Sequence, residues 1–175
     1  MVVINLGYTA PVNRPGQQPV LTLQQVWEGL QHKMRRADKF VPIITACEVL
    51  AEEEPSSPAD GGPRAVVTRR VTFQPDTGPW GKSTVVEVCR LYPPCRIDFV
   101  QEDGATIGNY VTQGPSGDPA DLLMTYVFQW NVPQVAEGSA EAKELEEKYR
   151  KTAKLAVESS IETIRKIVTG ELTLD

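Results

Sequence analysis

The sequence predicts an α+β protein in which a curved antiparallel sheet of about seven strands wraps around a long C-terminal helix. Residues 141–168 contain no Gly or Pro, and their apolar side chains recur at helical spacing. Before them lie seven short strand-like runs and one other helical segment. A sheet with one apolar face needs a covering layer, and a single helix laid across a curved sheet encloses a pocket. We therefore expect one domain over residues 1–175 with an internal cavity.

Composition excludes several classes of partner. The 175 residues carry a formal net charge of −5, which argues against nonspecific binding to nucleic acid or to an anionic membrane surface. No apolar run approaches the ~20 residues that span a bilayer. The N-terminus also lacks a basic region followed by an apolar stretch, so no signal peptide is expected. A cytoplasmic protein without nucleic-acid or membrane partners is the prediction.

The three cysteines and the single histidine point away from metal chemistry. Cys47, Cys89 and Cys95 fall in strand-like sequence, and their odd number predicts buried free thiols in a reducing compartment. There is no C-x-x-C pair, and His32 lies opposite the apolar stripe of the first predicted helix. We expect no metal site, no cofactor and a solvent-exposed histidine.

The first forty residues read as a strand, a loop and a helix. Val2–Tyr8 is strand-like, and residues 9–20 hold three prolines and a glycine. Thr22 and Gln25 fit a capping box, in which each side chain satisfies a free N–H of the first helical turn. The helix, near residues 22–36, should end before Pro42, because the residue that precedes a proline is disfavoured in the helical region.

Six further strands are expected as a meander. Their separators are turn-like and short, so consecutive strands must pair antiparallel. A longer acidic segment rich in Pro, Ser and Gly, Glu52–Pro63, is predicted to be a mobile loop. The strands are Ile43–Leu50, Arg64–Phe73, Ser83–Tyr92, Arg96–Glu102, Thr106–Thr112 and Leu122–Trp130.

Residues 21–42, LTLQQVWEGLQHKMRRADKFVP, resemble the signature of the AtaL-like family. That signature reads L-T-x-x-Q-[LV]-W-E-G-L, then a basic stretch, then K-F-V-P. The family is a branch of the birch-pollen-allergen and START-related (SRPBCC) superfamily. The resemblance implies a helix-grip fold with an internal cavity, and some members are encoded in fungal secondary-metabolite clusters. It transfers no catalytic motif, because the superfamily includes carriers, hormone receptors and cyclising enzymes alike.

Two charges stand out on otherwise apolar strand faces. Arg69 shares a face with Ala65, Val67, Val71 and Phe73, and Glu87 shares one with Val85, Cys89 and Leu91. A buried charge costs free energy unless it is paired. If the two faces coincide, Arg69 and Glu87 pair inside the cavity or present charge to a ligand. The opposite parity of residues 83–92 is also amphipathic, and a bulge would select it.

Other candidates line the predicted cavity. The last strand alternates with Met124, Tyr126, Phe128 and Trp130 on one face, which suits a flat or apolar ligand or an ordinary core. In the strand before it, either Asn109 or Tyr110 points inward. The middle of the apolar stripe on the long helix consists of small residues, Ala153, Ala156 and Ser160. Either the helix backbone approaches the sheet closely there, or space is left for a ligand. We expect a cavity of a few hundred Å³, with Phe99, Tyr126 and Phe128 in its wall.

The functional hypothesis is a protein that binds a small, mostly apolar molecule, aromatic or polyketide-like, as a carrier or sequestering protein. The alternative is an enzyme of specialised metabolism that catalyses cyclisation or proton transfer on a bound intermediate. Its catalytic candidates are Arg69, Glu87 and Tyr126. The ligand-binding candidates are Phe99, Asn109, Tyr110, Met124, Phe128, Ala153, Ala156 and Ser160.

Overall fold

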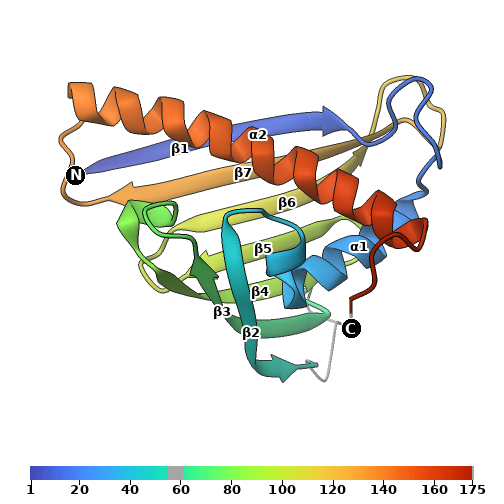
Figure 1. Ribbon diagram of the computed structural model, residues 1–175, viewed down its shortest axis with the longest axis horizontal. Coiled ribbons are helices and arrows are strands. Elements are labelled where there is room, and N and C mark those ends of the chain that lie inside the picture. The colour runs from blue at the N-terminus through green and yellow to red at the C-terminus, as the bar shows by residue number, and fades with distance from the viewer. Residues whose placement is uncertain (55–60, 175) are drawn as a thin grey trace.

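The structure is a computed structural model that describes residues 1–54 and 61–174. Its helices and strands follow the predicted order (Figure 1). The elements are β1 (Val2–Pro11), α1 (Leu23–Arg35), η1 (Ala37–Lys39), β2 (Ile44–Glu53), β3 (Ala65–Phe73), η3 (Pro79–Gly81), β4 (Thr84–Tyr92), β5 (Arg96–Gln101), β6 (Thr106–Gln113), β7 (Leu122–Val132) and α2 (Ala140–Val168). The loop predicted at Glu52–Pro63 starts later than expected, since β2 includes Glu52 and Glu53, and its residues 55–60 lie outside the described residues.

The described strands form one antiparallel sheet, in the order β1-β7-β6-β5-β4-β3-β2. Strands β2 to β7 are the predicted meander, and β1 returns to pair with β7, with Tyr8 opposite Tyr126. Two register irregularities interrupt the pairing of β2 with β3, at Ile44/Ala46 and Val49/Ala51. Bulges of this kind bend a strand and increase its twist. Both occur where β2 pairs with β3, at the edge of the sheet that curves most strongly in Figure 1.

Helix α2 covers the concave face of the sheet as one continuous helix of 29 residues (Figure 1). Ser139 caps its N-terminus, because the Ser139 hydroxyl accepts a hydrogen bond from the Ala142 N–H at 3.1 Å. The predicted apolar stripe is its buried side, from Tyr149 through Val157 to Ile164. The predicted start of this helix differs from the observed one by a single residue.

Helix α1 lies near the C-terminal end of α2 and closes that end of the fold (Figure 1). The predicted capping box is present: the Gln25 N–H donates to Thr22 Oγ1 at 3.2 Å, and the Thr22 N–H donates to Gln25 Oε1 at 2.9 Å. Gly29 faces α2, where an added Cβ would lie 2.4 Å from Cγ1 of Ile164. The absence of a side chain at Gly29 therefore permits the close contact between the two helices.

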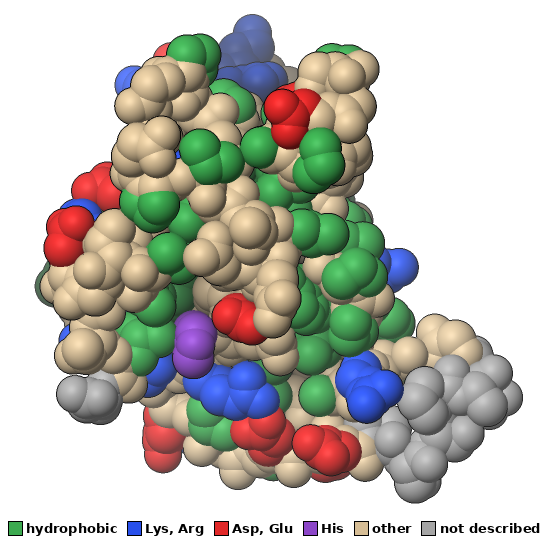
Figure 2. All heavy atoms as spheres, turned by 90° about the vertical axis from the view of Figure 1, so that its right-hand side faces the viewer, with side chains coloured by type: hydrophobic (Ala, Val, Ile, Leu, Met, Phe, Trp, Pro, Cys, Tyr) green, Lys and Arg blue, Asp and Glu red, His purple; other side chains and the backbone are tan. Residues whose placement is uncertain are grey.

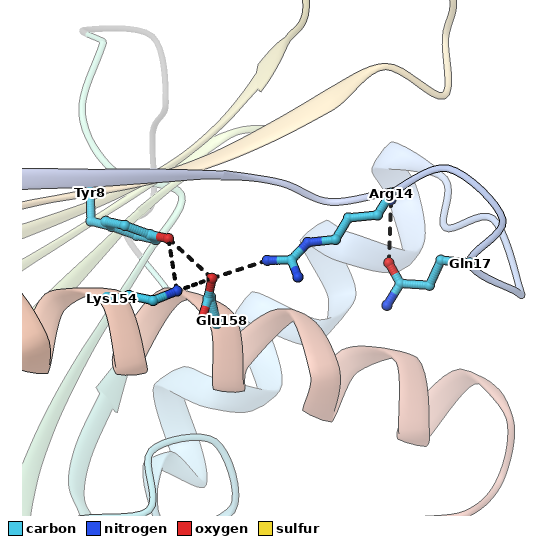
Figure 3. A network of polar contacts seen from close by, with 5 residues as sticks. All are labelled: Tyr8, Arg14, Gln17, Lys154 and Glu158. Carbon is cyan, nitrogen blue, oxygen red and sulfur yellow. Dashed lines mark hydrogen bonds and ion pairs between the residues drawn. The ribbon is translucent and has the colours of Figure 1, made fainter.

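A polar network joins β1 to the flank of α2 (Figure 3). Three donors converge on one oxygen of Glu158: Tyr8 Oη at 3.0 Å, Arg14 Nη2 at 3.0 Å and Lys154 Nζ at 2.5 Å. The side chains of Arg14 and Lys154 are 56% and 54% exposed. Because exposed ion pairs contribute little free energy, we expect this network to add little to the stability of the fold.

His32, the single histidine of the chain, is exposed on α1, as predicted. Its imidazole is visible at the surface in Figure 2. The described residues contain no group of three or more His, Cys, Asp or Glu side chains arranged to hold a metal ion. No helix in the described part of the chain is both long and apolar enough to cross a membrane.

The three cysteines are free, but the prediction that all are buried is wrong. Cys89 is buried in β4 and Cys47 is half-buried in β2, whereas Cys95 is exposed. Cys95 occupies the turn between β4 and β5 rather than a strand, and a turn at the sheet edge has no layer above it. Burial raises the pKa of the Cys89 thiol to about 12.

These positions predict different thiol reactivities. Cys95 should react rapidly with a thiol reagent in the native protein, and Cys89 should react only after denaturation, because the thiolate is the nucleophile and burial disfavours it. A titration of protein denatured without reductant should count all three thiols. A count of one would reveal a disulfide and contradict the expectation of a reducing compartment.

Candidate functional site

A cavity lies between the concave face of the sheet and α2. Its volume is about 90 Å³, smaller than the few hundred Å³ expected. Long charged side chains, Lys33 and Arg69, and the stacked rings of Phe128, Trp130 and Tyr149 are among the residues that line it. A space of this size takes a small ring or a few water molecules. It is lined by Lys33, Ala37, Val41, Ile43, Ile44, Arg69, Val71, Phe73, Thr77, Pro79, Glu87, Phe99, Gln101, Ile107, Tyr126, Phe128, Trp130, Tyr149, Thr152 and Ala156.

One row of the sheet supplies the polar end of this cavity. Arg69, Glu87 and Gln101 stand opposite one another on β3, β4 and β5. Arg69 Nη2 and Nε donate to Glu87 Oε2 at 2.7 and 2.9 Å, and Gln101 Nε2 donates to Glu87 Oε1 at 2.9 Å. Their side chains are buried, with Arg69 5% and Glu87 4% exposed. The ion pair expected if the two strand faces coincide is therefore present.

Arg69 also caps the C-terminal end of helix α1. Its Nη1 donates to the backbone oxygens of Lys33 and Met34 at 2.9 and 3.0 Å. The last carbonyls of a helix have no partner within it and carry partial negative charge, so a buried guanidinium there is favourable. Both ends of the Arg69 guanidinium are thus occupied within the protein, by a carboxylate and by a helix terminus.

Lys33 brings a second cationic group to the same place. The residue is 6% exposed, and its Nζ lies 4.1 Å from the ring centroid of Tyr126 and 5.6 Å from that of Phe99. Among the described residues, no hydrogen bond or ion pair to Lys33 Nζ is formed. Burial, followed by the charge of Arg69, lowers the pKa of Lys33 to about 7. Deprotonation of this amine near neutral pH is therefore far easier than for an exposed lysine.

Three buried polar groups near the cavity have atoms without hydrogen-bond partners among the described residues: Gln101 Oε1, Tyr126 Oη and both amide atoms of Asn109. Burial raises the pKa of Tyr126, and the nearby Ser160 hydroxyl opposes that effect without reaching the geometry of a good hydrogen bond. Ser160 Oγ instead donates to Ala156 O at 2.6 Å. Unsatisfied buried polar groups are costly, so each of them is a candidate contact for a bound molecule or water.

Aromatic rings form an apolar part of the cavity wall. Phe128 stacks on Trp130 with ring centroids 4.6 Å apart and planes at 14°, and Trp130 meets Tyr149 of α2 at 4.3 Å. Phe128 and Trp130 follow Tyr126 on the inward face of β7, as the alternation of that strand predicts. These three aromatic residues give the cavity an apolar lining that suits a ligand ring.

The structure brings six of the predicted site residues together at the cavity: Arg69, Glu87, Phe99, Tyr126, Phe128 and Ala156. Four others are fully buried close by but do not line it: Asn109, Met124, Ala153 and Ser160. For the small residues of α2 both alternatives therefore hold, because the helix is close-packed at Ala153 and Ser160 and borders space at Ala156.

Tyr110 is the one predicted ligand-binding residue on the wrong face. It lies opposite Arg96 and Thr125 on the outer side of the sheet, while its neighbours Asn109 and Val111 are buried. The Tyr110 ring rests over Gly108, where a Cβ would lie 2.4 Å from the Tyr110 hydroxyl. The missing side chain at Gly108 leaves room for the ring on the outer face, and this fixes the parity of β6 with Asn109 inward.

Sequence reasoning missed Lys33 and Gln101. Both carried a usable signal: Lys33 falls three residues after Leu30 and seven after Val26, within the apolar stripe of α1. Gln101 continues the inward alternation of Ile97 and Phe99 in β5. A polar residue in an apolar pattern is the same observation that singled out Arg69.

A seven-stranded antiparallel sheet gripping a long C-terminal helix over a cavity defines the helix-grip class. Within it, the chain belongs to the AtaL family, whose model is described as acetylaranotin biosynthesis cluster protein L and matches residues 6–170. A relative of that name from Aspergillus terreus (strain NIH 2624 / FGSC A1156) is 28% identical over 162 residues, which cover 93% of this chain and 88% of the relative.

Solved structures show the same fold at low sequence identity. The di-domain ARO/CYC StfQ from the steffimycin biosynthetic pathway matches with a TM-score of 0.62 at 12% identity, over 97% of this chain and 51% of StfQ. The di-domain ARO/CYC BexL from the BE-7585A pathway matches with 0.59 at 14%, over 94% of this chain and 49% of BexL. This chain thus spans about half of each. TTHA0849 from Thermus thermophilus matches over its full length, with a TM-score of 0.56 at 12% identity and 98% of this chain covered.

Proposed function

We propose that this protein binds a small, mostly apolar molecule with a flat ring, aromatic or polyketide-like, as a carrier or sequestering protein of specialised metabolism. One observation carries the proposal: the cavity lining combines aromatic rings with two buried polar atoms that have no hydrogen-bond partner among the described residues, Gln101 Oε1 and Tyr126 Oη. A ligand ring packed on Phe128 would place its polar substituents toward these atoms. The relative's place in a biosynthesis cluster and the ARO/CYC neighbours from biosynthetic pathways agree with a role in specialised metabolism.

The size of the cavity limits how the ligand binds. About 90 Å³ accommodates one ring or a short segment. The rest of a larger molecule would extend past the half-buried lining residues Thr77, Pro79 and Thr152, which we take as the mouth of the cavity. Thr152 borders the cavity from α2 and is half-buried. Because this position is only half-buried, we expect a larger side chain here to narrow the mouth without disturbing the fully buried residues of α2.

A Thr152→Phe variant should therefore lose affinity for an apolar aromatic probe. We expect anilinonaphthalene sulfonate, titrated by fluorescence, to bind at least about tenfold more weakly, equivalent to ~1.4 kcal/mol. The matched control is Lys151→Phe, which adds the same ring at the next position on the solvent side of α2. Equal probe affinity in both variants, with unchanged melting temperatures, would contradict ligand entry at this mouth.

The second candidate function is an enzyme that cyclises its ligand or transfers a proton on it. Lys33 and the unpartnered hydroxyl of Tyr126 favour it, since both groups can exchange a proton inside the cavity. Arg69 and Glu87 are weaker catalytic candidates than the sequence suggested, because they are held by each other, by Gln101 and by α1. Small molecules released from the native protein and returned to it should be recovered unchanged by a carrier and converted by an enzyme, as mass spectrometry would record.

A further inference from the structure

We infer that Lys33 is a nucleophilic amine that forms an imine with an aldehyde or ketone group of the cavity ligand. The inference rests on the proposed binding function and names the substrate class, a carbonyl compound with an apolar ring. Lys33 lines the cavity with its Nζ 4.1 Å from the centroid of the Tyr126 ring, and no described residue forms an ion pair or hydrogen bond with that Nζ. A lysine of structural purpose would be paired at this degree of burial.

The surroundings keep the amine reactive. The titratable and charged groups of the neighbouring elements are Arg69 on β3, Glu87 and Cys89 on β4, Tyr126 on β7 and Tyr149 on α2. Glu87 is the carboxylate of this set, and Arg69 and Gln101 hold both of its oxygens. Desolvation in an apolar site beside a second cation is the environment that activates a lysine as a nucleophile.

The reaction needs no partner beyond the ligand itself. The neutral Nζ adds to the carbonyl carbon, the carbonyl oxygen takes up protons and leaves as water, and a C=N bond replaces the C=O bond. Both hydrogens of the amine are lost from nitrogen to water in this exchange, and nothing is oxidised or reduced. On protonation of the imine, its positive charge would lie over the Tyr126 ring, where Lys33 Nζ is 4.1 Å from the centroid.

Benzaldehyde with cyanoborohydride tests the inference, because hydride converts the imine into a stable benzyl amine. At pH 7 we expect a single benzyl group per chain, located at Lys33 by peptide mass spectrometry and formed at least about tenfold faster than at any exposed lysine. Lys154→Arg is the matched control, since Lys154 is exposed and its pKa is raised by Glu158, and it should leave labelling unchanged. Lys33→Met should abolish the fast labelling, and Thr152→Phe should slow it.

A second measurement does not depend on any carbonyl compound. A lysine with a folded pKa of about 7 and an unfolded value near 10.5 binds more protons when unfolded, so folding stability rises with pH between these values. The midpoint of urea unfolding should therefore increase from pH 7 to pH 10 more in the native protein than in Lys33→Met. Equal pH dependence of the two proteins would show that Lys33 is an ordinary charged lysine and overturn the inference.

The two proposals fail separately. If the probe binds normally but benzyl groups appear on exposed lysines and not at Lys33, the imine inference is overturned. The proposed binding function is not contradicted by that result. If Thr152→Phe changes neither the fast labelling of Lys33 nor the binding of the probe, the proposed mouth and ligand position are contradicted. The reactive amine is still supported in that case.

Discussion

Replacing Arg69 with Met is expected to lower the free energy of unfolding by about 3–5 kcal/mol, and Glu87→Leu should have a similar effect. Each change leaves the partner charge buried, where the pair is joined at 2.7 Å and its side chains are 5% and 4% exposed. Arg69→Met also removes the donors to the Lys33 and Met34 carbonyls at the end of α1. Urea unfolding followed by circular dichroism measures the loss.

The double variant separates pairing from packing. Arg69→Met with Glu87→Leu removes both members of the pair, so neither is left buried without its partner, and keeps similar volume; its cost should be much smaller than the sum of the two single costs. The chain offers a matched control one residue away: Arg70 and Glu48 also meet at 2.7 Å, but their side chains are 46% and 63% exposed. Removing that pair should change stability by less than about 1 kcal/mol. Equal losses at both pairs would contradict the buried-pair interpretation.

The pairing of Arg69 with Glu87 could be predicted because each is the lone charge on an apolar strand face. The same periodicity predicted α2, the meander and the inward face of β7, since burying one side of a sheet leaves few alternative arrangements. Which side chains of β6 face inward could not be predicted from the sequence, and the reason is physical. Asn109 has no hydrogen-bond partner among the described residues, so no pattern favours burying it over Tyr110. Gly108 leaves space for the Tyr110 ring on the outer face of β6, and this contact forms only in the folded strand, so the sequence alone does not reveal it.

The existence and general position of the cavity could be predicted, but not its size or its exact lining on the helix. Ala153, Ala156 and Ser160 are equally small in sequence, yet only Ala156 borders the space. Which of them meets the sheet depends on the distance between helix and strands, and large side chains elsewhere set that distance. Lys33 was missed because it belongs to a basic stretch, Lys33–Arg36, in which solvent exposure is the usual outcome for each residue.

The close approach of α1 to α2 predicts the second large effect. Gly29→Ala should destabilise the protein by about 1–3 kcal/mol, the usual cost of overpacking, although alanine is the better helix former by roughly 1 kcal/mol. The new Cβ would lie 2.4, 2.8 and 3.0 Å from three side-chain carbons of Ile164. Ile164 is 1% exposed, so its side chain has little free space into which it could move.

A second substitution tests whether this contact is the cause. Ile164→Ala alone should cost about 2–5 kcal/mol through lost burial and an unfilled cavity. In that background the three clashing carbons are absent, so adding Gly29→Ala should be neutral or stabilising by up to about 1 kcal/mol, from helix propensity and partial filling of the space. The sign of the Gly29→Ala effect is thus expected to reverse between the two backgrounds. Stabilisation in both backgrounds, measured by urea unfolding, would mean that the helices lie further apart and that Gly29 is not required for their contact.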